Sequence, residues 1–261
     1  MENQGDGALQ GFINEILSFA QTRHARPSLR EAEQSLRSAA QRDYGAALRK
    51  QFDRQQITEI VAELRTVLPT LNREVFRIKD PRRLRKIADT MGVLLKANVF
   101  KGSDGRELRG FYVPDRQFLK RPLICVNTAN HPVAVAAAFW HEIGHHLTTR
   151  LLYDDRARTL NMSYASRYED HLDDQREIAA DMVMGMACYP KPAAQRLFGD
   201  SRRNFLNGDP DRLVSRVVPH VRAVTGFDFA NGFSARENLH YLAGIIHLAK
   251  LRSALLCEYG I

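Results

Sequence analysis

The feature that most constrains this chain is the sequence His-Glu-Ile-Gly-His at residues 141–145, which follows a long apolar run from Val133 to Trp140. Residues four apart lie on one face of an α-helix, so His141 and His145 can direct two imidazole rings at one metal ion. Glu142 lies beside them, where its carboxylate can take a proton from a water molecule bound to that metal. The pattern therefore predicts a metal-binding helix that also carries a general base.

A third protein ligand is expected, because catalytic zinc sites usually use three and leave the fourth position to water. One known pattern places a histidine six residues after the second one, but Leu151 occupies that position here. The other route is a carboxylate on a later helix, and Glu177, which opens the segment Glu-Ile-Ala-Ala-Asp, fits it. Asp170, Asp173 and Asp174 are the competing ligands.

Asp181 follows Glu177 by four residues and so shares its helix face. We expect its carboxylate to accept a hydrogen bond from the nitrogen of a ligating histidine that faces away from the metal. Such a bond fixes the tautomer and the orientation of the ring. The small side chains of Ala179 and Ala180 predict that this second helix approaches the first one closely.

The composition is that of a chain with one sizeable core or two small ones, since 44% of its 261 residues are apolar. No run of 18 apolar residues predicts a membrane span, and the polar start of the sequence is unlike a signal peptide. Three cysteines without a C-x-x-C pair fit a reducing cytoplasm. We expect each of them, Cys125, Cys188 and Cys257, to be a buried packing residue.

Positive charge is concentrated in the first part of the chain. Residues 1–120 hold 22 Lys and Arg against 15 Asp and Glu, whereas residues 121–261 hold 16 against 15. The densest basic cluster is Lys79 to Lys86. Such a surface can meet nucleic acid or an acidic partner, but acids interspersed among the bases favour a solvated helical face.

Helices are predicted on both sides of the metal-binding segment. Apolar residues recur at helix spacing within residues 9–17 and 57–64, and Ser28 to Glu31 and Ser234 to Glu237 have the pattern of capping boxes. Pro81 is expected to start a short helix that ends near Gly92. The histidines of the last predicted helix, His240 and His247, are interpreted as structural residues.

Three apolar runs between these helices predict strands, at residues 93–100, 108–113 and 123–127. The predicted fold is α+β and mostly helical, with a small sheet of about three strands packed on the metal-binding helix, as in a zincin. We divide the chain into a helical region, a metallopeptidase core and a second helical region, at residues 1–78, 79–195 and 196–261.

Several of these segments together resemble the ImmA/IrrE metallopeptidases. The resemblance covers roughly residues 80–190, and its motifs are Gly110-Phe111-Tyr112-Val113, Ile124-Cys125-Val126-Asn127, His131-Pro132, the stretch from His141 to Leu147, and Glu177-x-x-Ala180-Asp181 ending at Tyr189-Pro190. It implies a zincin-like domain in which His141, His145 and Glu177 bind the metal and Glu142 is catalytic. It also implies limited proteolysis of a helix-turn-helix repressor, which releases stress-response or mobile-element genes.

The function expected from the sequence is therefore that of a cytoplasmic endopeptidase that uses Zn²⁺, or alternatively Mn²⁺. A further donor should stabilise the oxyanion, and the candidates are Tyr112, His146, Tyr164, Tyr168 and His171. His146 is expected to point away from the metal, since it lies about 100° around the helix from its neighbour His145. Two alternatives are a non-catalytic, metal-stabilised scaffold that binds a regulator or DNA, and a hydrolase acting on a substrate other than a peptide.

Overall fold

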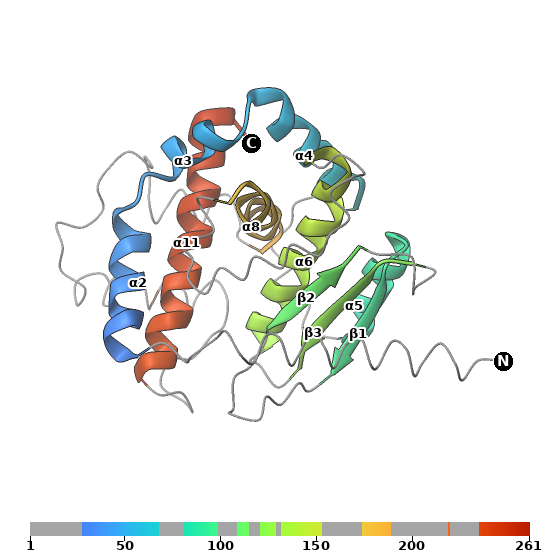
Figure 1. Cartoon of the computed structure of the whole chain (residues 1–261), viewed down its shortest axis with the longest axis horizontal. Coiled ribbons are helices and arrows are strands. Elements are labelled where there is room, and N and C mark those ends of the chain that lie inside the picture. The colour runs from blue at the N-terminus through green and yellow to red at the C-terminus, as the bar shows by residue number, and fades with distance from the viewer. Residues whose placement is uncertain are drawn as a thin grey trace.

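The computed structural model describes residues 28–67, 81–98, 109–114, 121–128, 132–152, 174–188, 219 and 235–261. It is an α+β structure, mostly helical, with one small mixed sheet (Figure 1). The helices are α2 (Leu29–Gln41), α3 (Tyr44–Gln51), α4 (Arg54–Val67), α5 (Pro81–Thr90), α6 (Pro132–Leu152), α8 (Gln175–Cys188) and α11 (Ala235–Tyr259). The strands are β1 (Leu94–Asn98), β2 (Gly110–Val113) and β3 (Leu123–Asn127).

Side chains just before the helices fix where several of them begin. The predicted capping box of α2 is confirmed, because Ser28 and Glu31 each accept a hydrogen bond from the other's backbone N–H. Asp53 and Gln56 make the same reciprocal pair at the start of α4. The helix predicted from Pro81 is also confirmed, and the turn after it contains Gly92 with a φ of 72°, a conformation that favours glycine.

The sheet has the strand order β1-β3-β2, with β1 parallel and β2 antiparallel to β3. All three strands lie within the predicted apolar runs, and β3 has the predicted bounds. Every residue of β3 is buried, so both faces of the central strand are covered. Helix α6 packs against β2 and β3, while α5 packs against β1.

Helix α8 occupies the centre of the molecule, where Figure 1 shows it end-on between α11 and α6. Its residues 178–188 are all buried. The predicted close approach of the two site helices is confirmed: a Cβ atom added at Gly144 of α6 would lie only 2.6 Å from the Cα of Ala180 on α8. The side-chain amide of Gln175 also donates to the carbonyl of Gln51, which ties the start of α8 to the end of α3.

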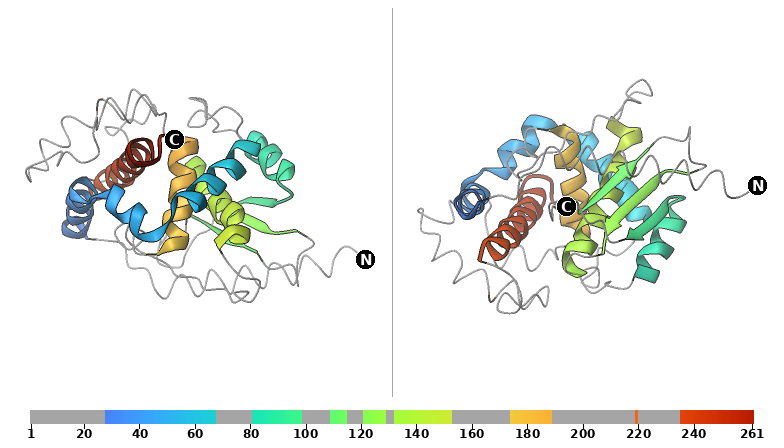
Figure 2. Two further views of the ribbon diagram at one scale, coloured as in Figure 1. Left: turned by 90° about the horizontal axis from the view of Figure 1, so that it is seen from above. Right: turned by 60° about the horizontal axis from the view of Figure 1, so that its bottom comes forward.

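The flanking helices close the other side of α8. Helix α11 packs along α2 and also contacts α3 and α8, and the views of Figure 2 agree on this arrangement. One continuous hydrophobic core runs through α2, α3, α4, the sheet, α6, α8 and α11. The described helices of the two flanking regions predicted from the sequence, at residues 1–78 and 196–261, thus share one interior with the described part of residues 79–195.

Two of the three cysteines are buried as predicted, but the prediction for Cys257 is wrong because this residue is exposed on the last turns of α11. The apolar stripe at residues 9–17 and the cap at Ser234 lie outside the described residues. Among the helices that the structure describes, none is both long and apolar enough to cross a membrane.

Candidate metal centre

The site is built where α6 crosses α8. His141 and His145 lie one turn apart on α6, and Glu177 lies in the first turn of α8. The Nε2 atoms of the two histidines are 3.1 Å apart, and the Glu177 carboxylate reaches within 3.2 Å of the first and 3.7 Å of the second. Oε2 of Glu177 lies nearest to His141 and Oε1 lies nearest to His145, so the carboxylate faces both imidazoles. The ligand atoms of the three residues lie within 4.8 Å of one another, so these residues can hold a metal ion.

The spacing of these atoms fits a tetrahedral zinc ion. Zinc bonds to histidine nitrogen and carboxylate oxygen are about 2.0–2.2 Å long, so neighbouring ligand atoms of a tetrahedron lie about 3.3–3.6 Å apart. From Nε2 of His141, Nε2 of His145 lies 3.1 Å away and Oε2 of Glu177 lies 3.2 Å away, both close to that value. The donor set of two imidazoles and one carboxylate is also one that catalytic zinc sites use.

The hydrogen bond of His141 explains why these atoms favour a cation. Its Nδ1 lies 2.8 Å from Oδ1 of Asp181, which is fully buried, and a carboxylate there accepts the Nδ1–H. In the neutral imidazole, which is the form that binds a metal, the Nε2 of His141 then carries a lone pair that faces His145 and Glu177. Acceptors that converge in a partly buried place repel one another unless a positive charge lies among them.

The pKa of His141 reflects the same neighbouring carboxylates. Burial by itself lowers the pKa of this imidazole, but hydrogen bonds and charge interactions with Asp181 and Glu177 outweigh burial and raise the pKa well above its ordinary value. Groups that stabilise a proton on His141 also stabilise a metal ion in the same place.

Glu142 of α6 lies against strand β2 of the sheet. It is buried, with only 6% of its surface exposed, and it faces the edge strand β2. A Cβ atom added at Gly110 of β2 would lie 3.3 Å from Oε1 of Glu142 and 2.9 Å from the carbonyl oxygen of Cys125. The absence of a side chain at Gly110 therefore leaves room for the carboxylate beside the two histidines.

Tyr112 of β2 and His146 of α6 form a second contact between this strand and this helix. The Tyr112 hydroxyl lies 3.1 Å from Nδ1 of His146, and their rings meet edge to face. Since His146 follows Glu142 by one helical turn and Tyr112 follows Gly110 by two strand residues, the pair lies next to Glu142 on the β2 side of α6. His146 takes no part in the cluster of possible metal ligands, as its angular position on the helix predicted.

Of the remaining residues that the sequence suggested as metal ligands or oxyanion donors, the structure describes Asp174 alone. Asp174, one of the competing ligands, accepts the backbone N–H of Arg176 and so caps α8. Asp170, Asp173, Tyr164, Tyr168 and His171 lie outside the described residues.

Sequence reasoning gave no role at the site to His247 or Tyr44. His247 on α11 is fully buried, and its Nε2 lies 2.8 Å from Oδ2 of Asp181. Its Nδ1 lies 2.9 Å from the hydroxyl of Tyr44 on α3. These residues are 203 positions apart, so no local spacing pattern links them, and their burial within apolar helices matches that of ordinary core residues.

Residues 81–86 of the basic cluster lie on α5, and Lys79 lies outside the described residues. The side chains of Arg82, Arg83, Arg85 and Lys86 are exposed, while Leu84 and Ala88 of the same helix face the core. This amphipathic arrangement is what the interpretation as a solvated face predicts. Recognition of nucleic acid or of an acidic partner by this helix stays a prediction.

Comparison of this chain with protein families, with curated proteins and with solved structures finds no match. The case for a function therefore depends on the residues and geometry described above.

Proposed function

We propose that this protein is a metal-dependent endopeptidase with a zincin-like centre formed by His141, His145 and Glu177. The observation that carries the proposal is the convergence of these three ligand atoms next to the buried carboxylate of Glu142. A site that served only to stabilise the fold would use a closed set of four ligands and would have no need of a base beside it.

Each residue has a separate task in the proposed reaction. A bound zinc ion would lower the pKa of a coordinated water molecule to about 7 and polarise the scissile carbonyl group. Glu142 accepts the proton of the attacking water and passes it to the amine that leaves. Asp181 holds His141 in the tautomer whose Nε2 is a ligand. Among the candidate donors that the structure describes, we propose Tyr112 and His146, which contact each other, as the source of the hydrogen bond to the oxyanion.

A peptide substrate is favoured by the position of β2. Among the described residues this strand pairs only with β3, so it forms an edge of the sheet, and its backbone passes Glu142 at Gly110. An extended peptide can add to such an edge through main-chain hydrogen bonds. Its scissile bond would then be held near the base.

The substrate class we propose is a helix-turn-helix repressor, whose limited cleavage releases stress-response or mobile-element genes. Support for this step is the resemblance of residues 80–190 to the ImmA/IrrE metallopeptidases. Of the segments that carry the resemblance, those that the structure describes lie on β2, β3, α6 and α8, and His131 and Tyr189-Pro190 lie outside the described residues.

The substitution Glu142→Gln tests the mechanism. Gln keeps the shape of the side chain but takes up no proton near neutral pH, so the variant should fold and retain zinc while cleavage falls by at least about 10²–10⁴-fold. The assay incubates wild type and variant with candidate helix-turn-helix repressors from the same genome and reads fragments by mass spectrometry, with zinc content measured on the same preparations.

Two controls make the result decisive. A chelator should abolish cleavage by the wild type, and added zinc should restore it. Cleavage by Glu142→Gln at the wild-type rate would falsify the peptidase mechanism. Binding of the repressor by both proteins with cleavage by neither would favour the non-catalytic scaffold.

A further inference from the structure

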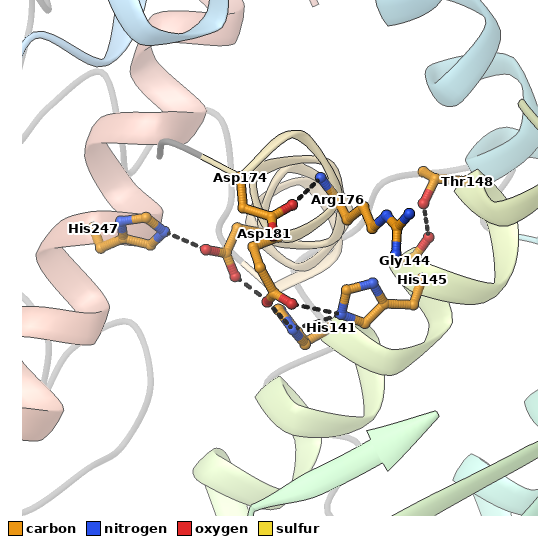
Figure 3. A network of polar contacts seen from close by, with 9 residues as sticks. His141, Gly144, His145, Thr148, Asp174, Arg176, Asp181 and His247 are labelled. Atoms are coloured by element: carbon orange, nitrogen blue, oxygen red, sulfur yellow. Dashed lines mark hydrogen bonds and ion pairs between the residues drawn. The ribbon is translucent and has the colours of Figure 1, made fainter. Parts of the chain in front are cut away.

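A line of hydrogen-bonded side chains leads from the candidate metal centre across α8 to α11 and α3. It runs from His141 on α6 through Asp181 on α8 and His247 on α11 to Tyr44 on α3, with successive separations of 2.8, 2.8 and 2.9 Å. Figure 3 shows the first three of these side chains, with Asp181 between the two imidazoles. Asp181 and His247 are fully buried and Tyr44 is 2% exposed.

The chemistry of these groups gives the hydrogen bonds one consistent direction. A carboxylate offers only acceptors, so Asp181 accepts Nδ1–H from His141 at one oxygen and Nε2–H from His247 at the other. A neutral His247 that donates through Nε2 carries a lone pair on Nδ1. That lone pair accepts the hydroxyl proton of Tyr44. Each member of the line thus determines the tautomer or the rotamer of the next.

The outer end of the line is itself fixed in place. The Tyr44 ring meets the His247 ring edge to face at 5.2 Å, and the ammonium of Lys250 lies 5.3 Å from the centre of the Tyr44 ring. Lys250 also donates to the carbonyl oxygens of Ala40 and Arg42, beside the end of α2. Tyr44 is therefore held by α2, α3 and α11 together.

We propose that His247 and Tyr44 are positioning residues of the metal centre. They hold the Asp181 carboxylate in the orientation that keeps Nε2 of His141 directed at His145 and Glu177. The proposal rests on the metal site of the proposed function and extends it, because it makes α3 and α11 part of the centre. Removing either residue should weaken metal binding in a protein that still folds.

Zinc affinity and the cobalt spectrum test this, since a purely structural role would change neither. His247→Leu removes the donor to Asp181, and the loss of such an outer partner typically weakens metal binding about 10–100-fold. Tyr44→Phe removes one hydroxyl oxygen and should weaken zinc binding about 2–10-fold, which is the contribution of one hydrogen bond. Affinity is measured by competition with a chromophoric chelator. The visible absorption of the Co²⁺-substituted protein reports the ligand geometry.

Two further variants separate positioning from stability. His247→Gln retains an N–H donor near Asp181 and should recover most of the zinc affinity. Leu255→Ala leaves a cavity two turns further along α11, in the same core, and should lower the melting temperature while leaving zinc affinity and the cobalt spectrum unchanged.

Wild-type zinc affinity and an unchanged cobalt spectrum in folded His247→Leu would overturn the proposal. If that variant does not fold, unchanged affinity in Tyr44→Phe overturns it instead. If the variants weaken zinc binding but the wild type cuts no repressor, the peptidase is rejected and this inference stands. Repressor cleavage by the wild type together with unchanged zinc affinity in the variants would support the peptidase and reject this inference. A wild type that binds no zinc would reject both.

Discussion

At the scale of single residues, Lys250 shows how a buried charge affects stability. The side chain is 3% exposed, and burial lowers the pKa of its ammonium from 10.5 to about 8. Below pH 8 the amine is protonated in the folded and the unfolded chain alike. Between about pH 8 and 10.5 the unfolded chain still holds its proton and the folded chain has lost it, so the free energy of unfolding rises with pH.

We therefore predict that Lys250→Met removes a pH dependence worth about 3 kcal/mol over this interval. The measurement is urea unfolding of both proteins from pH 7 to 11. Burial also raises the pKa of Cys125 to about 12, which acts in the opposite sense, but this thiol is common to both proteins and cancels in their difference. A difference that does not change with pH would contradict the lowered pKa of Lys250.

Residue spacing explains which parts of the candidate site could be predicted. His141, His145, Glu177 and Asp181 were found because each pair is four residues apart on one helix, and helical geometry then fixes which side chains share a face. His247 could not be found in this way. Its contact with Asp181 depends on how α11 packs against α8, and packing between helices distant in sequence leaves no periodic pattern.

At the scale of the elements, the contact between α6 and α8 sets the distance between the two halves of the metal site. Gly144 lies against the backbone of Ala180, with no space for a methyl group. We predict that Gly144→Ala pushes the helices apart, lowers the free energy of unfolding by about 1–3 kcal/mol, and weakens zinc binding by moving Glu177 away from the histidines. Thermal unfolding and chelator competition measure the two effects.

Gly185 on α8 is the matched control for this substitution. A Cβ atom there would lie 3.5 Å from its nearest neighbour, the carbonyl oxygen of Leu248, which is an ordinary contact. Gly185→Ala should therefore stabilise α8 by up to about 1 kcal/mol through helix propensity, with zinc affinity unchanged. If both substitutions change the free energy of unfolding and the zinc affinity equally, close packing at Gly144 does not set the distance between the two helices.

The elements themselves were predictable to different degrees. Helix starts followed from local chemistry, as at Ser28 and Pro81, and strands followed from short apolar runs bounded by turn residues. The order and direction of the strands did not follow, because neither the parallel pairing of β1 with β3 nor the edge position of β2 is encoded by any local pattern. For the proposed peptidase this edge position is the most important of these features, since among the described strands it leaves β2 open to a substrate beside Glu142.

At the scale of the whole molecule, we expect the candidate metal centre and the flanking helices to unfold as one cooperative unit, because one continuous core joins them. Helices α2, α3 and α11 share their interior with α6 and α8, and the line of hydrogen bonds from His141 to Tyr44 crosses the same interior. A ligand that binds only the folded state should therefore stabilise all of these elements together, including those far from the site.

The only tryptophan makes this testable, because Trp140 is fully buried on α6 directly before His141. Its fluorescence reports the centre, while far-ultraviolet circular dichroism reports every helix. Free zinc at 100 times its dissociation constant adds about 2.7 kcal/mol, which should raise both thermal midpoints together by about 5–10 °C. His141→Ala should show no shift. If zinc moves the fluorescence transition alone and leaves a separate, unshifted dichroism transition, α2 and α11 unfold independently of the metal centre, and the single-unit interpretation is wrong.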